Sequence, residues 1–220
     1  MSIQHWPTVL DHVERVPGVL AASQTVTSSA FAIRGAAEKP VLLRGVDAER
    51  FLSVIDVRSK MIAGRFNVSG DGVVIGAGLS DLLGLTLGDK LRITTATGRG
   101  ALLVVRGIFD MGNKEVNERW VIAPIRVAQT LFDLPGGANT IELRVADVFD
   151  ADEIAKDVAD RTGLEVNSWM KINAQLLVGL RSQDNSKYMI QFFVVVAVAL
   201  GIASVLIVSV VQKSREIGIL

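Results

Sequence analysis

The glycine-rich segment GAGLSDLLG, residues 76–84, is the stretch whose residue types could bind a phosphate. Closely spaced glycines let backbone N–H groups approach a phosphate. However, a P-loop also ends in Gly-Lys-Ser/Thr, and a dinucleotide-binding loop needs glycines at G-x-G-x-x-G offsets. Gly76, Gly78 and Gly84 satisfy neither pattern. We therefore interpret them as turn and packing glycines.

The two histidines, His5 and His12, are the residues that could ligate a transition metal. They are seven positions apart and could share one face of a helix. A protein zinc site needs three or four His, Cys or carboxylate ligands, and the sequence has no further histidine and no cysteine. We interpret both histidines as solvated surface residues.

Carboxylates and hydroxyls form no recognisable catalytic set. Asp147, Asp150 and Asp152 lack the spacing of an EF-hand and its closing glutamate, so helix capping explains them better. Ser80-Asp81 has no basic partner that could act as a general base. The sequence therefore predicts no catalytic, cofactor or metal site, and a protein that is not an enzyme.

Composition excludes further classes. The 23 basic residues balance the 23 acidic ones, so no net charge favours nucleic acid. The absence of cysteine excludes a disulfide framework.

One segment is continuously apolar. Residues 188–211 comprise 24 residues without a charged side chain. A helix of this length spans roughly 36 Å, which exceeds the hydrocarbon thickness of a bilayer, about 30 Å. We expect one transmembrane helix in contact with membrane lipid. Within it Ala197 and Gly201 are four apart, a spacing at which small residues let helices pack closely in lipid; ordinary lipid-facing small residues are the alternative.

The residues before this segment predict a domain and a stalk. Over 168–187, apolar residues recur on one helical face, so we expect an amphipathic stalk helix. Over 1–167, alternating apolar residues and short helical patterns predict an α+β domain. The expected elements are a helix over 8–16, three strands between 19 and 46, a helical turn over 47–52, an irregular stretch around 67–72, strand, helix, turn and strand over 73–93, strands over 101–110 and 119–123, a helix from Pro124 to about Phe132, a turn over 134–139, a strand over 141–145, and a helix N-capped by Asp150 and ending near Arg161.

The segment after the apolar run turns polar and then apolar again. Lys213, Arg215 and Glu216 precede Ile217-Gly218-Ile219-Leu220. This apolar tip could lie in the lipid headgroup region, or it could dock into a groove of a cytosolic protein; the residues alone leave both alternatives open.

Taken together, the sequence resembles the FtsX/MacB-like superfamily of ABC-transporter permeases, and its lipoprotein-releasing (Lol-type) branch most of all. The resemblance is carried by the order of several segments more than by any one of them. They are VERVPGVLAAS (13–23), KPVLLRGVD (39–47), GVVIGAGLSDLLGLTLGDKLRI (72–93), VVRGIFD (104–110), LFDLPGGANTIELRV (131–145), SWMKINAQLLVGL (168–180) and QKSREIGIL (212–220).

The resemblance implies an architecture and a set of partners. Residues 1–167 correspond to a MacB-like periplasmic core domain, 168–187 to its stalk, 188–211 to a span of the bacterial inner membrane, and 212–220 to the start of a cytoplasmic coupling segment. The implied partners are a cytosolic ABC ATPase dimer, which carries the ATPase activity, and a second permease subunit, a copy or a paralogue.

The resemblance also implies roles for particular residues. Arg215, Glu216, Ile217, Gly218 and Leu220 correspond to residues that contact the ATPase. In Lol-type permeases a hairpin near the position of Leu134, Pro135 and Gly136 captures a periplasmic carrier. The LPGGAN turn of this sequence looks compact, which departs from the family's hairpin. A contact with a carrier or adaptor at this turn is what the resemblance implies.

Other departures and alternatives remain. The family's first span, the rest of its coupling segment and its last two spans have no counterpart in this sequence. A MacB-type extruder of drugs, peptides or glycolipids is the alternative within the superfamily. A tail-anchored α+β binding module is the alternative from another class, and it would place residues 1–187 in the cytosol instead of the periplasm.

Overall fold

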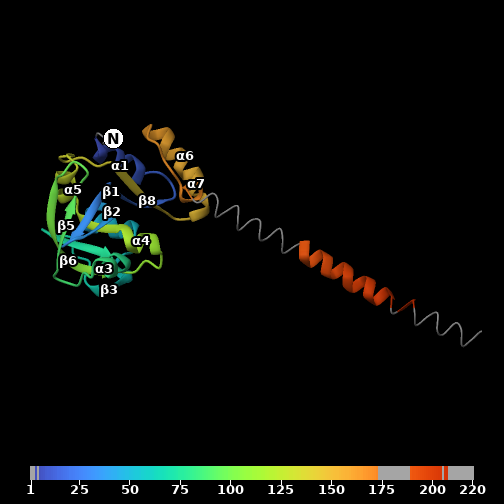
Figure 1. Cartoon of the computed structure of the whole chain (residues 1–220). Coiled ribbons are helices and arrows are strands. Elements are labelled where there is room, and N and C mark those ends of the chain that lie inside the picture. The colour runs from blue at the N-terminus through green and yellow to red at the C-terminus, as the bar shows by residue number, and fades with distance from the viewer. Residues whose placement is uncertain (1–2, 4, 173–188, 205, 208–220) are drawn as a thin grey trace, which may run out of the picture. The chain divides into compact units, whose positions relative to one another are not determined.

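The structure is a computed structural model that describes residues 3, 5–172, 189–204 and 206–207 (Figure 1). The chain divides into two compact units, Met1–Val166 and Asn167–Leu220.

The first unit is built on a mixed sheet of eight strands. The strands are β1 (Val19–Arg34), β2 (Ala37–Val46), β3 (Met61–Gly64), β4 (Gly72–Gly76), β5 (Lys90–Thr94), β6 (Gly100–Phe109), β7 (Trp120–Pro124) and β8 (Thr140–Val145). The helices are α1 (Trp6–Glu14), α2 (Ala48–Val54), α3 (Ala77–Leu83), α4 (Lys114–Arg119), α5 (Ile125–Leu131) and α6 (Ala151–Thr162), with 3-10 turns η1 (Arg58–Lys60) and η2 (Val148–Asp150). The predicted α+β class is confirmed.

Six of the strands close into a ring. Their order is β2-β7-β4-β6-β5-β1, and β1 also pairs with β2, which joins the two ends. The pairs β2–β7 and β4–β6 are parallel, while the other pairs in the ring are antiparallel. β8 pairs with the first half of β1, and β3 pairs with the end of β6.

The interior of the ring is apolar and is filled from α3 and α5. Leu79 and Leu83 of α3 and Ala128 and Leu131 of α5 belong to the same buried cluster as the inward side chains of the strands. A second cluster lies on the other face of β4 and β7 and is centred on Phe51 of α2. β4 contributes side chains to both clusters, which explains why its sequence GVVIG is apolar at successive positions instead of alternating.

A third, smaller cluster joins α1 and α6 to the open end of β1 and β8. Val13 and Val16 pack with Ile154 and Val158, and Leu143 and Val145 of β8 cover them from the sheet. The predicted helices over 8–16 and 151–161 are therefore present, each within two residues of its expected start. Asp150 occupies the N-cap position of α6 as predicted, but its side chain makes no capping hydrogen bond there. Asp147 accepts a bond of 2.8 Å from the Phe149 N–H and caps η2.

Three further expectations need correction. The segments expected as two strands between 19 and 34 form one strand of 16 residues, because Ser28 and Ser29 both pair with β2 instead of turning. The stretch before β4 contains a short strand, β3, that the sequence analysis did not predict. α4 was also not predicted; it is a short helix capped by Asn113, whose side chain accepts from the Val116 N–H.

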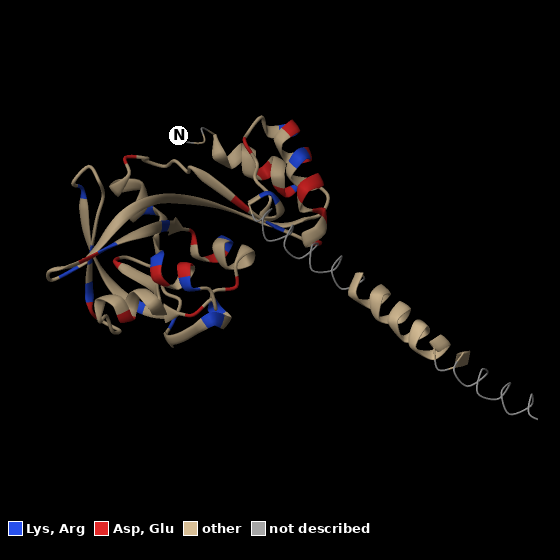
Figure 2. Cartoon of the chain, turned by 45° about the vertical axis from the view of Figure 1, so that its right-hand side comes forward, with Lys and Arg blue, Asp and Glu red and all other residues tan. Residues whose placement is uncertain are grey.

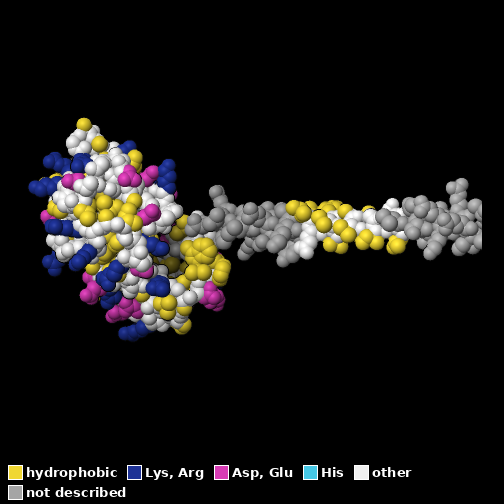
Figure 3. All heavy atoms as spheres, turned by 90° about the horizontal axis from the view of Figure 1, so that it is seen from below, with side chains coloured by type: hydrophobic (Ala, Val, Ile, Leu, Met, Phe, Trp, Pro, Cys, Tyr) yellow, Lys and Arg dark blue, Asp and Glu magenta, His cyan; other side chains and the backbone are white. Residues whose placement is uncertain are grey.

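The second unit is helical at residues 169–172, 189–204 and 206–207. α7 (Trp169–Ile172) begins after Ser168, whose hydroxyl accepts from the Lys171 N–H at 3.1 Å. Residues 189–204 and 206–207 are also helical, and none of them is charged (Figure 2). Their apolar side chains are exposed, and hydrophobic atoms cover much of this segment in Figure 3.

The expectation of a stalk helix and a single spanning helix is not confirmed. Among the described residues, no helix combines the length and the apolar character needed to cross a bilayer. Positions 173–187 of the expected stalk, and 188, 205 and 208–211 of the expected span, lie outside the described residues.

Candidate functional site

The turn at Leu134–Gly136, expected to contact a periplasmic partner, lies between α5 and β8. The Gly137 N–H donates to the Leu134 carbonyl at 2.9 Å, which closes a four-residue turn. Pro135 occupies its second position, and Gly136, at the third, has φ of 68°. Proline followed by a residue with positive φ is the signature of a type II turn, so these residues specify a tight turn at this place.

Side chains from two helices fix this turn to the domain. The Trp6 indole N–H of α1 donates to the Gly136 carbonyl at 2.9 Å, and the Gln129 side chain of α5 donates to the Gly137 carbonyl at 2.8 Å. Leu134 is half-buried against the ring interior, while Pro135 and Gly136 are exposed. The turn is therefore compact, as the sequence indicated, and presents only a small apolar tip.

Asn139 then sets the start of β8. Its side-chain oxygen accepts from the Thr27 N–H at 2.8 Å, and its side-chain nitrogen donates to the Thr27 carbonyl at 2.7 Å. The side-chain amide of Asn139 thus takes the place of one pair of backbone hydrogen bonds between β1 and the turn. Consequently the tip at Pro135 is positioned by a rigid support and not by a free hairpin.

The glycine-rich segment around Gly76 is a packing site and not a phosphate loop. A Cβ atom at Gly76 would lie 2.2 Å from the Asn117 carbonyl oxygen, and one at Gly78 would lie 2.7 Å from the Glu118 side chain. Both glycines therefore allow α4 to approach the start of α3. The sequence interpretation of these residues as packing glycines is confirmed.

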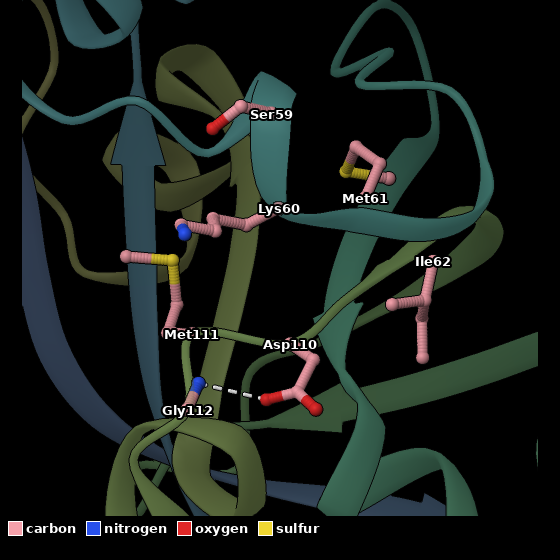
Figure 4. Close-up of a pocket in the computed structure, with 7 residues that line it drawn as sticks. All are labelled: Ser59, Lys60, Met61, Ile62, Asp110, Met111 and Gly112. Atoms are coloured by element: carbon pink, nitrogen blue, oxygen red, sulfur yellow. Dashed lines mark hydrogen bonds between the residues drawn. The ribbon is translucent and has the colours of Figure 1, made fainter.

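A surface depression of about 360 Å³ lies beside the loop that follows β6 (Figure 4). Met61, Ile62 and Met111 form its apolar wall, and Ser59, Lys60, Asp110 and Gly112 complete it. Asp110 accepts from the Gly112 N–H at 2.8 Å and from the Asn117 side chain at 2.6 Å, and these bonds hold the pKa of Asp110 below its ordinary value. Asp110 therefore organises the loop.

A second depression, on the other side of the same loop, is lined by α3 and α4 and contains Asp81, Glu118 and Lys114. No group of three potential ligands within the described residues is arranged to hold a metal ion. His5 and His12 are both exposed, and His12 bonds to the Thr8 carbonyl of its own helix at 2.7 Å. These observations agree with the interpretation of the histidines as surface residues.

An ion pair between β2 and β8 was not predicted. Arg44 of β2 is 2% exposed, and its guanidinium lies 3.9 Å from the ring centroid of Trp120 and 5.1 Å from that of Phe51. It donates to the carboxylate of Glu142 on β8. Burial lowers the pKa of Arg44 and raises the pKa of Glu142, and the attraction between the two charges partly offsets both shifts. The pair ties β8 to β2 across β1, which is a structural role.

Comparisons with known proteins identify the first unit. Residues 2–161 match the family described as the MacB-like periplasmic core domain. The chain belongs to this family.

One curated relative extends the match beyond the core domain. The lipoprotein-releasing system transmembrane protein LolC of Neisseria meningitidis serogroup B is 24% identical over 230 aligned positions, which cover 98% of this chain. The chain spans about half the length of that relative, 55%. Membership of the MacB-like superfamily, expected from the order of the sequence segments, is thus confirmed.

Solved structures support the fold of the MacB-like core domain. The extracellular domain of the noncanonic ABC-type transporter YknZ from Gram-positive bacteria has a TM-score of 0.52 at 14% identity, over 76% of this chain and 87% of that one. The periplasmic region of MacB from Actinobacillus actinomycetemcomitans has a TM-score of 0.48 at 14% identity, over 73% and 75%. The likeness in fold rests on the first of these.

The residues predicted to couple the MacB-like domain to an ATPase cannot be placed. Arg215, Glu216, Ile217, Gly218 and Leu220 lie outside the described residues. Ala197 and Gly201 lie in the described helix with exposed side-chain positions, and a Cβ added at Gly201 would meet no atom within 4 Å. The roles of both groups stay predictions.

Proposed function

We propose that this chain is part of a permease subunit of an ABC transporter, in which ATP hydrolysis by a cytosolic ATPase dimer moves a periplasmic domain. The observation that carries the proposal is the alignment with a lipoprotein-releasing transmembrane protein over 98% of the chain, which continues past the core domain to the C-terminal segment. By this relationship the transported cargo is a lipoprotein that is released from, or exported across, the inner membrane.

The proposal assigns a task to each part of the chain. Residues 1–167 form the periplasmic domain, 168–187 a stalk that transmits its movement, 188–211 a transmembrane helix in contact with lipid, and 212–220 the start of the cytoplasmic coupling segment. A second permease subunit, a copy or a paralogue, completes the membrane part, and Ala197 and Gly201 provide close helix packing there.

The apolar tip of the C-terminal segment supplies the docking energy to the ATPase. Burying a side chain such as Ile217 or Leu220 stabilises a contact by roughly 1.5–3 kcal/mol, which exceeds the contribution of an exposed ion pair, about 0–1 kcal/mol. Arg215 and Glu216 then orient the segment, and Gly218 permits a close backbone approach.

The test compares Ile217→Asp with Ile219→Asp in the complete permease. Positions two apart point to different sides of a helix, so a groove that holds Ile217 does not hold Ile219. We expect Ile217→Asp to abolish ATPase stimulation by cargo or to dissociate the ATPase, and Ile219→Asp to have a small effect. Pull-down of the ATPase and its stimulated hydrolysis rate are the measurements. Equal behaviour of the two variants would contradict the coupling role and favour a segment that rests in the headgroups.

The turn at Leu134, Pro135 and Gly136 is the proposed contact for a periplasmic carrier or adaptor. Its exposed tip at Pro135 on a rigid support favours a small, preorganised contact. Replacing Pro135 by Asp should reduce capture of the carrier in a pull-down without lowering the melting temperature. MacB-type extrusion of drugs, peptides or glycolipids is the second candidate, favoured by the family to which the core domain belongs; a cargo that is exported without any lipoprotein release would select it.

A further inference from the structure

One outer face of the ring carries apolar side chains that the core does not use. The face is formed by the second half of β1 together with β2, β5 and β6, which are neighbours in the sheet (Figure 1). We name it the β1 face. Its outward positions are Ser29, Phe31 and Ile33 on β1, Glu38, Pro40 and Leu42 on β2, Lys90, Arg92 and Thr94 on β5, and Gly100, Leu102 and Val104 on β6.

The registers of the strands define which of these residues are neighbours. Directly opposed residues of antiparallel strands point to the same face of a sheet. One row across the four strands is Glu38–Ile33–Arg92–Leu102, and the next row is Pro40–Phe31–Thr94–Gly100. Phe31 therefore lies at the centre of the face with apolar residues beside it in both rows.

These side chains are exposed or partly exposed, although their neighbours in sequence fill the ring. Ala30 and Ala32 of β1 are 2% and 0% exposed and point inward, whereas Phe31 between them is 37% exposed. Leu102 of β6 is 52% exposed. An antiparallel sheet with one solvated face normally alternates apolar and polar residues, and half of the outward positions here break that rule. An exposed apolar patch of this kind marks an interaction surface.

The charges of the β1 face are arranged to match those of a second copy. Glu38 and Arg92 lie in one row on opposite sides of Ile33. Neither of them forms an ion pair within the part of the chain that the structure describes. Rotating a copy by 180° about an axis that runs along β1 exchanges the β2 side with the β5 side. This operation places Glu38 of each copy opposite Arg92 of the other, and it places Phe31 opposite Phe31.

We propose that the β1 face is a homodimer interface with its two-fold axis along β1. A two-fold interface must be self-complementary, and this axis satisfies both charges. An axis between β1 and β5 instead faces Ile33 with Arg92 and leaves Glu38 against Leu102, which leaves both charges unpaired. The face spans four strands at about 4.8 Å spacing and buries much less than the roughly 800 Å² per partner of a stable complex. The contact is therefore transient and depends on a shared membrane to raise the local concentration.

This inference rests on the membrane anchorage in the proposed function, but it needs neither an ATPase nor a cargo. It concerns only the MacB-like domain and a second copy of the same chain. Loss of transport coupling would leave it untouched, and failure of the dimer would not contradict the transport proposal.

The test uses the absence of cysteine in the chain. Ser29 lies on the proposed axis and is exposed, and Ser59 on η1 is also an exposed serine and lies outside the face. The full-length variants Ser29→Cys and Ser59→Cys are reconstituted separately into lipid vesicles and treated with a short bis-maleimide linker. We expect a covalent dimer for Ser29→Cys at a rate at least tenfold above that of Ser59→Cys. Equal rates would overturn the proposal.

Variants in the Ser29→Cys background test the register. Phe31→Asp should abolish the fast crosslinking, while Ile62→Asp, at an exposed apolar residue of β3, should not. Glu38→Arg and Arg92→Glu should each slow crosslinking by roughly fivefold, the scale of losing exposed ion pairs, and the double variant should restore it. A double variant that stays slow would overturn the assigned axis. Unchanged thermal unfolding of each variant excludes a folding defect as the cause.

Discussion

At the scale of single residues, the ion pair of Arg44 and Glu142 contributes more to the position of β8 than to the free energy of folding. Moving two charges out of water costs more than their attraction usually returns. The rings of Trp120 and Phe51 offset part of this cost, because the guanidinium lies over both of them. The Arg44 Nε and one oxygen of Glu142 still have no hydrogen-bond partner among the described residues. The pair therefore fixes where β8 lies more than it stabilises the fold.

No sequence pattern could have revealed this pair. Arg44 and Glu142 are 98 positions apart, and each stands in a segment that otherwise predicts an ordinary strand. By contrast, the Pro135-Gly136 turn could be predicted, because its two residues encode their own backbone angles. A turn that adjacent residues specify can be predicted from the sequence, whereas a contact that forms only when the ring of strands closes cannot.

The raised pKa of Glu142 gives a prediction with a definite sign. Burial raises this pKa above its ordinary value of 4.5, so between 4.5 and the folded-state pKa the folded chain binds a proton that the unfolded chain releases. The stability contributed by Glu142 is therefore fully present below 4.5 and is lost as the pH rises through the folded-state pKa. The melting temperature of the parent chain, measured relative to Glu142→Gln, should fall as the pH rises across this window.

The matching control comes from exposed carboxylates. Hydrogen bonds from neighbouring residues lower the pKa of Asp56, Asp89 and Asp110, so their contribution is lost only as the pH falls below about 3.8. They act equally in the parent and in Glu142→Gln and cancel in the difference. A difference that rises with pH above 4.5 would show that the attraction to Arg44 outweighs burial.

At the scale of elements, the predictable strands were those with alternation or a continuous apolar run. β4, β5, β6, β7 and β8 lie where the sequence indicates them. The three strands expected between 19 and 46 are two, because β2 pairs with Ser28 and Ser29 and so keeps these polar residues within β1. β3 and α4 are too short for a period to show in the sequence.

The packing of α3 against α4 gives the prediction at this scale. Gly76→Ala would bring a Cβ atom to 2.2 Å from the Asn117 carbonyl oxygen, which is backbone and cannot move aside. Overpacking of this kind costs about 1–3 kcal/mol, so the free energy of unfolding in urea should fall by about that amount. Gly100→Ala is the matched control, because its Cβ would meet its neighbours at 3.4 Å or more. An unaffected Gly76→Ala would mean that α4 is held less tightly than the structure indicates.

At the scale of the whole molecule, the class of the first unit was predictable, whereas the stalk and span expected for the second unit are not confirmed. The first unit has apolar faces that must be buried against one another, so its α+β class follows from the pattern of its elements. The second unit shows an uncharged helix at 189–204 whose apolar side chains no other described residue covers. Such a surface is unfavourable in water, and contact with lipid therefore stays the prediction for this segment.

The orientation of the chain is the last prediction, and it separates the permease proposal from a tail-anchored module. The permease places Ser59 outside the cytoplasmic membrane and Ser214 inside, whereas a tail-anchored module with a cytosolic domain reverses both. Because the chain has no cysteine, Ser59→Cys and Ser214→Cys each provide one thiol for a membrane-impermeant maleimide. In spheroplasts that express the complete permease, we expect Ser59→Cys to react at once and Ser214→Cys to react only after the membrane is opened with detergent. Labelling of Ser214→Cys alone in the intact spheroplasts would contradict the permease, since the C-terminal segment could not then reach a cytosolic ATPase.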